Sequence, residues 1–564
     1  MKKLTIKLIA SLLICSINTN AQTNTGKIDS LTDFDGRKYS YIGEIKNKLP
    51  NGIGVAMYPE KSGLSKYAGN FVNGFFEGKG VMLLENDDFI SCNWERGKLL
   101  GQVTRYKKNN LFVVSEYENS AMNGKSTTIY DDGQIMEALY KNNKLEGRGI
   151  IVNDKWDIIY DNKYENGNSN GQGYEYELSK MQLLEGIWKD DVFQNTTTNN
   201  YPTFLKDPLL KRNLHKNFNL IVGRTNLNDS KTLTGILYNK QTKTRQYGTF
   251  VDEKLTQGIT IVDGVSKAIG QFNDTLLNGF GHLTVKNKSY DKKDTYYGGE
   301  FKNGTLTGNK NIVIALGTLT ISFGSFEYFS ETNYLNEIET RIAQSKQGWK
   351  CGEYNDLQIG EFSEGVLYGK GMKITTDGYC INGIWAGDDL KELISLTNDK
   401  GELINTKANT LQEALSIVKK TYVRDGKLWG IVNGLYQGDE KFGWAGDSYY
   451  GLVKFPQSEE VNYIAKSEFY TAVYKITSDF IIANEKYNQL CNEIKGLKIL
   501  EKPLTTEGKI NQAKAKNDFT ITTFTNNDGS EFYVSVLLYK EKNSYKVAVI
   551  SGPKLPLELL KAEE

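Results

Sequence analysis

Glycines that recur at a nearly constant interval constrain the fold of this chain more than any other feature of its sequence. The glycines at positions 52, 78, 101, 124, 147 and 171 follow one another at intervals of 26, 23, 23, 23 and 24 residues. A fixed interval of roughly 20–50 residues is typical of repeat architectures. The sequence therefore predicts an array of similar units rather than one compact core.

Each unit shares one internal frame, which is clearest in the stretch Gly69-Asn70-Phe71-Val72-Asn73-Gly74. A small residue is followed two places later by an aromatic residue, then by a turn dipeptide, and a glycine stands nine places after the small residue. The alternation has the period of a β-strand. Asn-Gly favours a two-residue hairpin turn, because both central positions need positive φ. Each unit is therefore predicted to be a β-hairpin.

The frame residues occur in two runs and are expected to be structural. In the first run they are Gly43, Gly52, Gly69, Phe71, Gly78, Trp94, Gly101, Tyr117, Gly124, Tyr140, Gly147, Tyr164 and Gly171, and in the second Gly270, Phe272, Gly279, Gly299, Phe301, Gly308, Gly360, Phe362 and Gly369. One hairpin is barely stable alone, so stacked hairpins should bury their rings in a continuous row. The alternative is that the rings are exposed and bind a ligand.

This frame resembles the MORN (membrane occupation and recognition nexus) repeat, whose consensus runs Tyr-x-Gly-x-Phe/Trp-x-x-Gly-x-x-x-Gly-x-Gly. The stretch from Tyr67 to Gly80 matches it almost completely, and the resemblance covers residues 38–194 and 240–390. Several copies are degenerate, since the first glycine is replaced by Cys92, Ser115, Ala138 and Asn162. The resemblance implies a scaffold and, by the family's name, membrane association.

The first 21 residues have the pattern of a signal peptide. Lys2, Lys3 and Lys7 form a basic region, Leu8 to Ile14 a short apolar run, and Thr19-Asn20-Ala21 a cleavage site. Removing the leader changes the formal net charge from +1 to about −2, which favours neither nucleic acid nor an anionic membrane. The protein is therefore expected to be exported and to reside in the periplasm, on the cell surface or in the medium.

Two other interpretations of this N-terminus remain open. A membrane anchor would need about 20 apolar residues, more than this run supplies. Cys15 suggests a lipoprotein, although Ile14 stands where lipid attachment requires a small residue. In an exported chain the remaining cysteines could pair, and Cys351 and Cys380 are the closest in sequence, but isolated buried thiols are the simpler interpretation.

The rest of the chain departs from the repeat frame. Residues 195–239 are expected to form a linker and irregular segment, and helical spacing suggests an inserted helix near 331–346. Residues 391–564 are expected to form an α+β domain of unknown family. Its expected helices are Leu390–Leu396, Thr410–Tyr422 and Phe480–Leu497, and its expected strands Phe469–Ile476, Phe519–Phe524, Glu531–Tyr539 and Tyr545–Ile550. The fold class is thus mainly β, an elongated curved sheet with a small α+β domain.

Residues capable of catalysis are sparse. The two histidines, His215 and His282, lie outside 391–564, which excludes a Ser-His-Asp triad or a histidine zinc site there. Asp439, Glu440 and Asp447 are candidate paired acids, but solvated loop acids are the simpler interpretation. No catalytic residue, metal or cofactor is predicted.

The predicted function is that of an exported, non-enzymatic scaffold. It would bind a protein, a polymer or an envelope component along an extended β surface, and no nucleic acid. The alternative is an exported hydrolase acting on a polymer, with catalysis in the C-terminal domain and the repeats as binding platform.

Overall fold

The fold comes from a computed structural model of the whole chain. The structure describes residues 24–552 except 87, 108–110, 157, 178–181, 201–209, 214–219, 227–228, 240, 253, 287–293, 333–337, 353, 388, 405, 426–431, 439–447, 452, 454, 465–468, 496, 500–501, 513–518, 527–531 and 542. The expected fold class is confirmed, because antiparallel β-hairpins make up most of these residues.

The first run of hairpins forms a 15-stranded antiparallel sheet in which sequence order equals spatial order. Its strands are β1 (Asn24–Thr32), β2 (Lys38–Lys46), β3 (Leu49–Met57), β4 (Leu64–Val72), β5 (Phe75–Leu84), β6 (Phe89–Glu95), β7 (Lys98–Lys107), β8 (Leu111–Glu118), β9 (Ala121–Ile129), β10 (Ile135–Lys141), β11 (Lys144–Val152), β12 (Ile158–Glu165), β13 (Asn168–Glu177), β14 (Gln182–Lys189) and β15 (Val192–Asn200).

The second run forms another long antiparallel sheet, again in sequence order. Its strands are β16 (Leu210–Asn213), β17 (Leu220–Asn226), β18 (Asp229–Asn239), β19 (Thr244–Val251), β20 (Lys254–Val262), β21 (Ser266–Asn273), β22 (Leu276–Val285), β23 (Thr295–Lys302), β24 (Thr305–Ala315), β25 (Thr320–Thr332), β26 (Ile338–Cys351), β27 (Leu357–Ser363), β28 (Val366–Ile374), β29 (Cys380–Ala386), β30 (Asp389–Thr397) and the short β31 (Leu403–Ile404).

The C-terminal part is a small sheet with two helices. Its elements are α2 (Leu411–Asp425), β32 (Val432–Gly438), β33 (Ser448–Gly451), β34 (Glu460–Ile464), β35 (Phe469–Thr477), α3 (Phe480–Ile494), β36 (Lys498–Ile499), β37 (Lys502–Gln512), β38 (Phe519–Asn526), β39 (Tyr533–Glu541) and β40 (Ser544–Gly552). Leu415 and Val418 of α2 share one buried core with Trp385 of the last repeat hairpin. The C-terminal part therefore caps the end of the second sheet.

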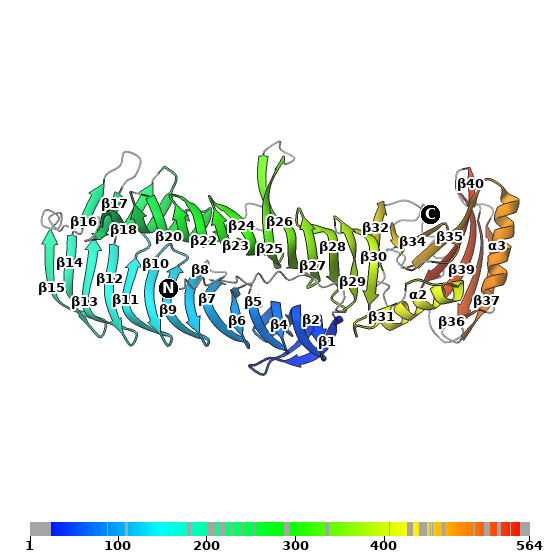
Figure 1. Cartoon of the computed structure of the whole chain (residues 1–564), viewed down its shortest axis with the longest axis horizontal. Helices are drawn as coiled ribbons and strands as arrows, with labels where there is room; N and C mark the ends of the chain where they lie inside the picture. Colours follow the sequence, from blue (N-terminus) through cyan, green and yellow to red (C-terminus); the bar gives the residue numbers. More distant parts are fainter. Residues whose placement is uncertain are drawn as a thin grey trace, which may run out of the picture.

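The two long sheets lie face to face, because the chain folds back after β15. Figure 1 shows them as two rows of strands along the long axis, with β15 beside β16 at one end and β1 close to β31 at the other. Buried residues of both sheets, including Val81 and Phe112 of the first and Ile259 and Ile314 of the second, form one cluster. We call this shared interface the seam. At its end, the backbone N–H of Lys27 donates to the Asp399 carbonyl oxygen at 2.7 Å.

The opposite, outer face of each sheet carries the aromatic frame residues. Phe71 is fully buried among Tyr41, Tyr67 and Phe76, and its ring centroid lies 4.9 Å from that of Tyr41. The second sheet has a smaller outer cluster that includes Phe272 and Phe301, whereas Phe362 lies in the core that this sheet shares with the C-terminal part. Edge-to-face contacts of this kind add to the energy of burial. Each sheet is therefore held together by its own rings on one face and by its partner on the other.

The frame glycines follow from the register of the strands. The ninth-place glycine of one hairpin lies opposite the aromatic residue of the next, as Gly52 lies opposite Phe71. It adopts a positive φ, +108° at Gly52, where a Cβ would also overlap the Glu44 carboxylate. That carboxylate accepts a hydrogen bond from the N–H of Ile53 at 2.6 Å. At the next glycine, Gly54, a Cβ would overlap the ring of Tyr41. Glycine is therefore required once per repeat, because at the ninth place the backbone has positive φ and lies too close to neighbouring side chains for a Cβ.

Two sequence predictions of helix are wrong. Most of the expected insertion near 331–346 is strand, because β25 and β26 form a long hairpin; residues 333–337 lie outside the described residues. Leu390–Leu396 is part of β30, not a helix. Two register shifts against β29 bring Leu390, Leu393 and Leu396 to the same core despite their spacing of three. The β-bulges therefore allow core residues of a strand to lie three apart, a spacing that in the sequence resembles that of a helix.

The boundaries also change at the expected linker. Residues 195–239 include the end of β15 and the strands β16, β17 and β18, so the second sheet begins before residue 240; 201–209 and 214–219 lie outside the described residues. At the other end, β30 continues the second sheet to Thr397. The expected helices at 410–422 and 480–497 are confirmed by α2 and α3. The four expected C-terminal strands are confirmed by β35, β38, β39 and β40.

Candidate binding site at the seam

Each strand crosses the width of the seam, so the inward-facing residues along one strand lie in order from one margin of the seam to the other. On β22, Thr284 lines a pocket beside the turns that connect hairpins, His282 is buried in the middle, and Phe280 reaches a second cavity nearer the hairpin tips. On β7, Tyr106 and Gln102 take the corresponding outer positions. We call the first cavity the turn pocket and the second the trough.

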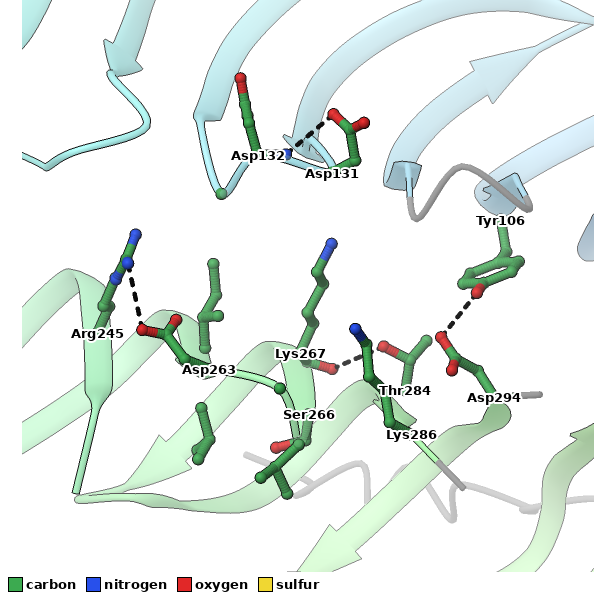
Figure 2. Close-up of a pocket in the computed structure, with 15 residues that line it drawn as sticks. Tyr106, Asp131, Asp132, Arg245, Asp263, Ser266, Lys267, Thr284, Lys286 and Asp294 are labelled. Atoms are coloured by element: carbon green, nitrogen blue, oxygen red, sulfur yellow. Dashed lines mark hydrogen bonds and ion pairs between the residues drawn. The ribbon is translucent and has the colours of Figure 1, made fainter. Parts of the chain in front are cut away.

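The turn pocket joins the two sheets through charged groups (Figure 2). It encloses about 120 Å³. The Tyr106 hydroxyl of the first sheet donates to the Asp294 carboxylate of the second at 2.7 Å. Arg245 of the second sheet forms an ion pair with Asp263 at 3.2 Å and donates to the Asp154 carbonyl oxygen of the first sheet at 3.0 Å. The contacts from Tyr106 to Asp294 and from Arg245 to Asp154 cross the seam and hold the two sheets together at this margin.

A lysine pair rises from the floor of the turn pocket toward the first sheet. Figure 2 shows Lys267 and Lys286 below the turn that carries Asp131 and Asp132. Lys267 donates to the Tyr130 carbonyl oxygen at 3.1 Å. Burial, and then the charge of Lys286, lower the pKa of Lys267 to about 8. Three bases and four acids line this pocket. Because charges of both signs are interleaved, the pocket is suited to holding the two sheets together and not to selecting a ligand of one charge.

His282 lies at the centre of the seam and is bonded to both sheets. Its Nε2 is 2.9 Å from Gln102 Oε1, and its Nδ1 is 2.8 Å from the Tyr296 hydroxyl and 3.1 Å from Thr104 Oγ1. An amide oxygen can only accept, so Nε2 carries the proton and Nδ1 accepts. Burial, and then the charge of Lys79, lower the pKa of His282 to about 3. This imidazole is therefore neutral and structural.

The trough is the open margin of the seam between the hairpin halves of the two sheets. It consists of two adjoining cavities of about 200 Å³ and about 90 Å³ that share Gln102, Phe280 and His282. The side chains that define it are Lys79, Asn93, Gln102, Glu116, Lys125 and Glu137 from the first sheet and Gln257, Gln271 and Phe280 from the second. The trough therefore crosses several strands of each sheet.

Two contacts fix the walls of the trough. Lys125 forms an ion pair with Glu137 at 2.8 Å, and its backbone N–H donates to Glu116 Oε2 at 3.0 Å. On the opposite wall the backbone N–H of Phe280 donates to Gln271 Oε1 at 3.1 Å. Glu116 and Gln271 occupy the same frame position that Glu44 occupies in the first hairpin, so the repeat itself positions these polar groups.

The frame residues singled out in the sequence lie in the sheets and outside this site. Their rings at positions 71, 94, 117, 164, 272, 301 and 362 are buried on the outer faces, and Tyr140 is half-buried. Sequence reasoning missed the trough residues. A signal existed at Phe280, which stands between Gly279 and Gly281, whereas the other Gly-x-Gly copies have Ile, Lys, Arg or Gln at the middle position.

The remaining candidates can be placed as follows. His215 and the acids Asp439, Glu440 and Asp447 lie outside the described residues. Cys92, Cys351, Cys380 and Cys491 are thiols that form no disulfide with one another. Burial raises the pKa of Cys92 to about 12 and that of Cys380 to about 11, so both remain protonated.

Within the described ranges, no three His, Cys, Asp or Glu side chains are grouped as metal ligands. Across the same ranges, no helix has the length and hydropathy to cross a membrane.

Comparison with known proteins agrees with the hairpin architecture. The family model of the MORN repeat matches residues 41–62 and 67–89, which run from within β2 to the first residue of β6. No curated protein matches the chain. The resemblance drawn from the frame is thus confirmed for these two copies, and the hairpins β21–β22 and β27–β28 of the second sheet repeat the same register.

Proposed function

The chain carries MORN repeats, and from that premise we propose that it is an exported, non-enzymatic scaffold that holds an extended partner along the trough. MORN repeats generally serve as scaffolds that bind proteins or membranes. The trough is the feature that carries the proposal, because it is a concave and polar surface built from consecutive hairpins of both sheets. Repeat arrays commonly bind along such continuous surfaces.

The roles of the reactive side chains support a non-enzymatic function. A general acid or base needs a pKa near the working pH, and that of His282 lies far below it. A nucleophilic cysteine needs a lowered pKa, whereas burial raises those of Cys92 and Cys380. These groups stabilise the sheets and are poorly suited to turn over a substrate.

Export rests on the pattern of the first 21 residues and has a direct test. Cells that produce the full chain should release a product whose first residue is Gln22. Edman sequencing or intact mass of the product recovered outside the cytoplasm measures this. A product that retains Met1 and remains in the cytoplasm would disprove export.

The scaffold role is tested by photo-crosslinking from inside the trough. A benzophenone amino acid replaces Gln257, an exposed trough residue, in the full chain. The control replaces Tyr354, which is 78% exposed in the turn before β27 and outside the trough. We expect a discrete adduct in producing cells from position 257 and none from position 354. Equal labelling from both positions, or none from 257, would overturn the proposal.

A further inference from the structure

We propose that the trough binds a neutral glycan, with a sugar ring stacked on the exposed face of Phe280. This inference rests on the proposed function, since it names the chemical class of the partner held in the same trough. Four observations carry it: the charge balance of the walls, their amide groups, the lack of a free strand edge, and the position of one aromatic ring.

The charged groups of the trough balance one another. Its acids are Glu116 and Glu137, and its bases are Lys79 and Lys125. Lys125 is paired with Glu137 at 2.8 Å, and Lys79 Nζ donates across the seam to the Lys310 carbonyl oxygen at 2.7 Å. A surface without net charge does not attract a polyanion or a polycation. The ligand that suits it is polar and uncharged.

The exposed uncharged polar side chains of the walls are amides, namely Asn93, Gln102, Gln257 and Gln271, while the hydroxyl groups of the lining are buried. Gln102 and Gln271 keep their NH₂ groups, because their oxygens accept from His282 and Phe280. A side-chain amide presents two donors and an acceptor close together. Sugar hydroxyls are also donors and acceptors, so neighbouring hydroxyls match this arrangement. Both walls of the trough carry such groups.

The strands that line the trough have no unpaired edge. β7, β8 and β9 are each paired on both sides, as are β20, β21 and β22. An extended peptide usually gains affinity by adding a strand to a free sheet edge. That mode is closed here, and the ligand has to be recognised through side chains. An extended polypeptide therefore loses the binding mode that would favour it over a glycan.

Phe280 supplies an apolar platform in the middle of these polar groups. Its side chain is 47% exposed at the junction of the two cavities, and its ring lies edge-on to His282 with centroids 5.4 Å apart. The apolar face of a pyranose ring can stack on such a surface, while the amides on either side bind its hydroxyls.

The test uses the mature full chain and isothermal titration calorimetry with cellohexaose, xylohexaose, maltohexaose and chitohexaose. At least one of these neutral hexamers should bind, and a hexamer of galacturonic acid should bind more weakly. F280A should weaken binding about tenfold or more, since one stacking contact is removed. Y354A removes an exposed ring outside the trough and should leave binding unchanged. Circular dichroism should show the same melting temperature for F280A as for the parent.

The outcomes separate this inference from the proposed function. If none of the four hexamers binds, or if F280A binds as tightly as the parent, the glycan inference fails. A protein adduct from the crosslinker at position 257 would then leave the scaffold proposal standing with a different partner. If the hexamers fail and position 257 also gives no adduct, both proposals fail.

Discussion

The outer faces of the two sheets and the seam between them are both buried, but they are built in different ways. On the outer face of the first sheet, rings from successive hairpins contact one another, as Phe71 contacts Tyr41 of the hairpin before it and Phe76 contacts Trp94 of the hairpin after it. Across the seam, Tyr296 packs its ring 4.9 Å from that of Phe89, more than two hundred positions away. The outer face is therefore local and repetitive, whereas the seam joins distant parts of the chain.

This difference assigns distinct roles to the two faces. Contacts between neighbouring hairpins can form as the array grows and tolerate degenerate copies, since each unit depends on its neighbours only. The seam needs both sheets in place, so polar groups such as His282 and Arg245 can fix their mutual register. The trough lies where the seam opens, and its geometry depends on that register more than on any single hairpin.

The largest effect is expected on the outer face. Phe71 is fully buried, so Phe71→Ala removes a ring from the aromatic cluster and should lower the free energy of unfolding by about 3–5 kcal/mol. Val72, its neighbour on β4, is 41% exposed, and Val72→Ala should change the same quantity by less than about 0.5 kcal/mol. Urea denaturation followed by tryptophan fluorescence measures both. Equal losses in the two variants would show that the ring is not part of the core.

The next effect belongs to the seam and depends on pH. The folded pKa of His282, about 3, lies below its ordinary value, so the unfolded chain takes up a proton first as the pH falls. The stability that neutral His282 contributes is complete above about pH 6.5 and is lost progressively toward pH 3. By pH 4 the loss should be about 3 kcal/mol.

The matched variant for this pH dependence is His282→Gln, which cannot titrate. Its stability at pH 7 is expected to be lower, because Gln cannot reproduce the contacts to Gln102, Thr104 and Tyr296. Its further loss between pH 6.5 and 4 should be about 3 kcal/mol smaller than that of the parent chain. Parallel slopes for the two proteins would contradict the assignment of His282 as a buried neutral group.

The contrast between local contacts on the outer faces and long-range contacts in the seam explains which parts of the fold the sequence could predict. The hairpins, their turns and the buried rings follow from residues a few places apart, and Gly52, Phe71 and Gly78 are enough to reveal the frame. Face-to-face packing of the sheets could not be predicted, because the inner positions of the strands vary from copy to copy. Ile42, Ala68 and Val114 each stand one place before the small residue of their hairpin, all lie in the seam, and share only their apolar character.

The candidate site was hidden for the same reason. Gln102 and His282 are unremarkable in sequence and become a pair only when the sheets meet. Phe280 alone carried a local signal, as the aromatic exception within the Gly-x-Gly motif. The errors at 331–346 and at Leu390–Leu396 arose where β pairing, with its bulges, imposed a strand on an apolar pattern of helical spacing.

A smaller effect tests why the ninth-place residue is glycine. Gly124 has φ +120°, and a Cβ there would overlap the Glu116 carboxylate. Gly101 has φ +68° with no heavy atom near such a Cβ, so Gly101→Ala suffers only from its backbone conformation. Gly101→Ala should cost about 1 kcal/mol and Gly124→Ala about 2–3 kcal/mol by thermal denaturation. Adding Glu116→Ala to Gly124→Ala should recover part of the difference, and no recovery would contradict the role of the carboxylate.

The smallest effect is expected at the rim of the trough, where the seam is exposed to solvent. Lys125 and Glu137 form an ion pair at 2.8 Å with side chains 44% and 25% exposed. Exposed pairs contribute about 0.2–1 kcal/mol, because solvent screens the charges and two side chains lose freedom. A double-mutant cycle of Lys125→Met and Glu137→Gln should give a coupling in that range, falling further in 1 M NaCl. A coupling above about 2 kcal/mol would mean that the trough is closed to water, which would remove the open surface on which a bound partner depends.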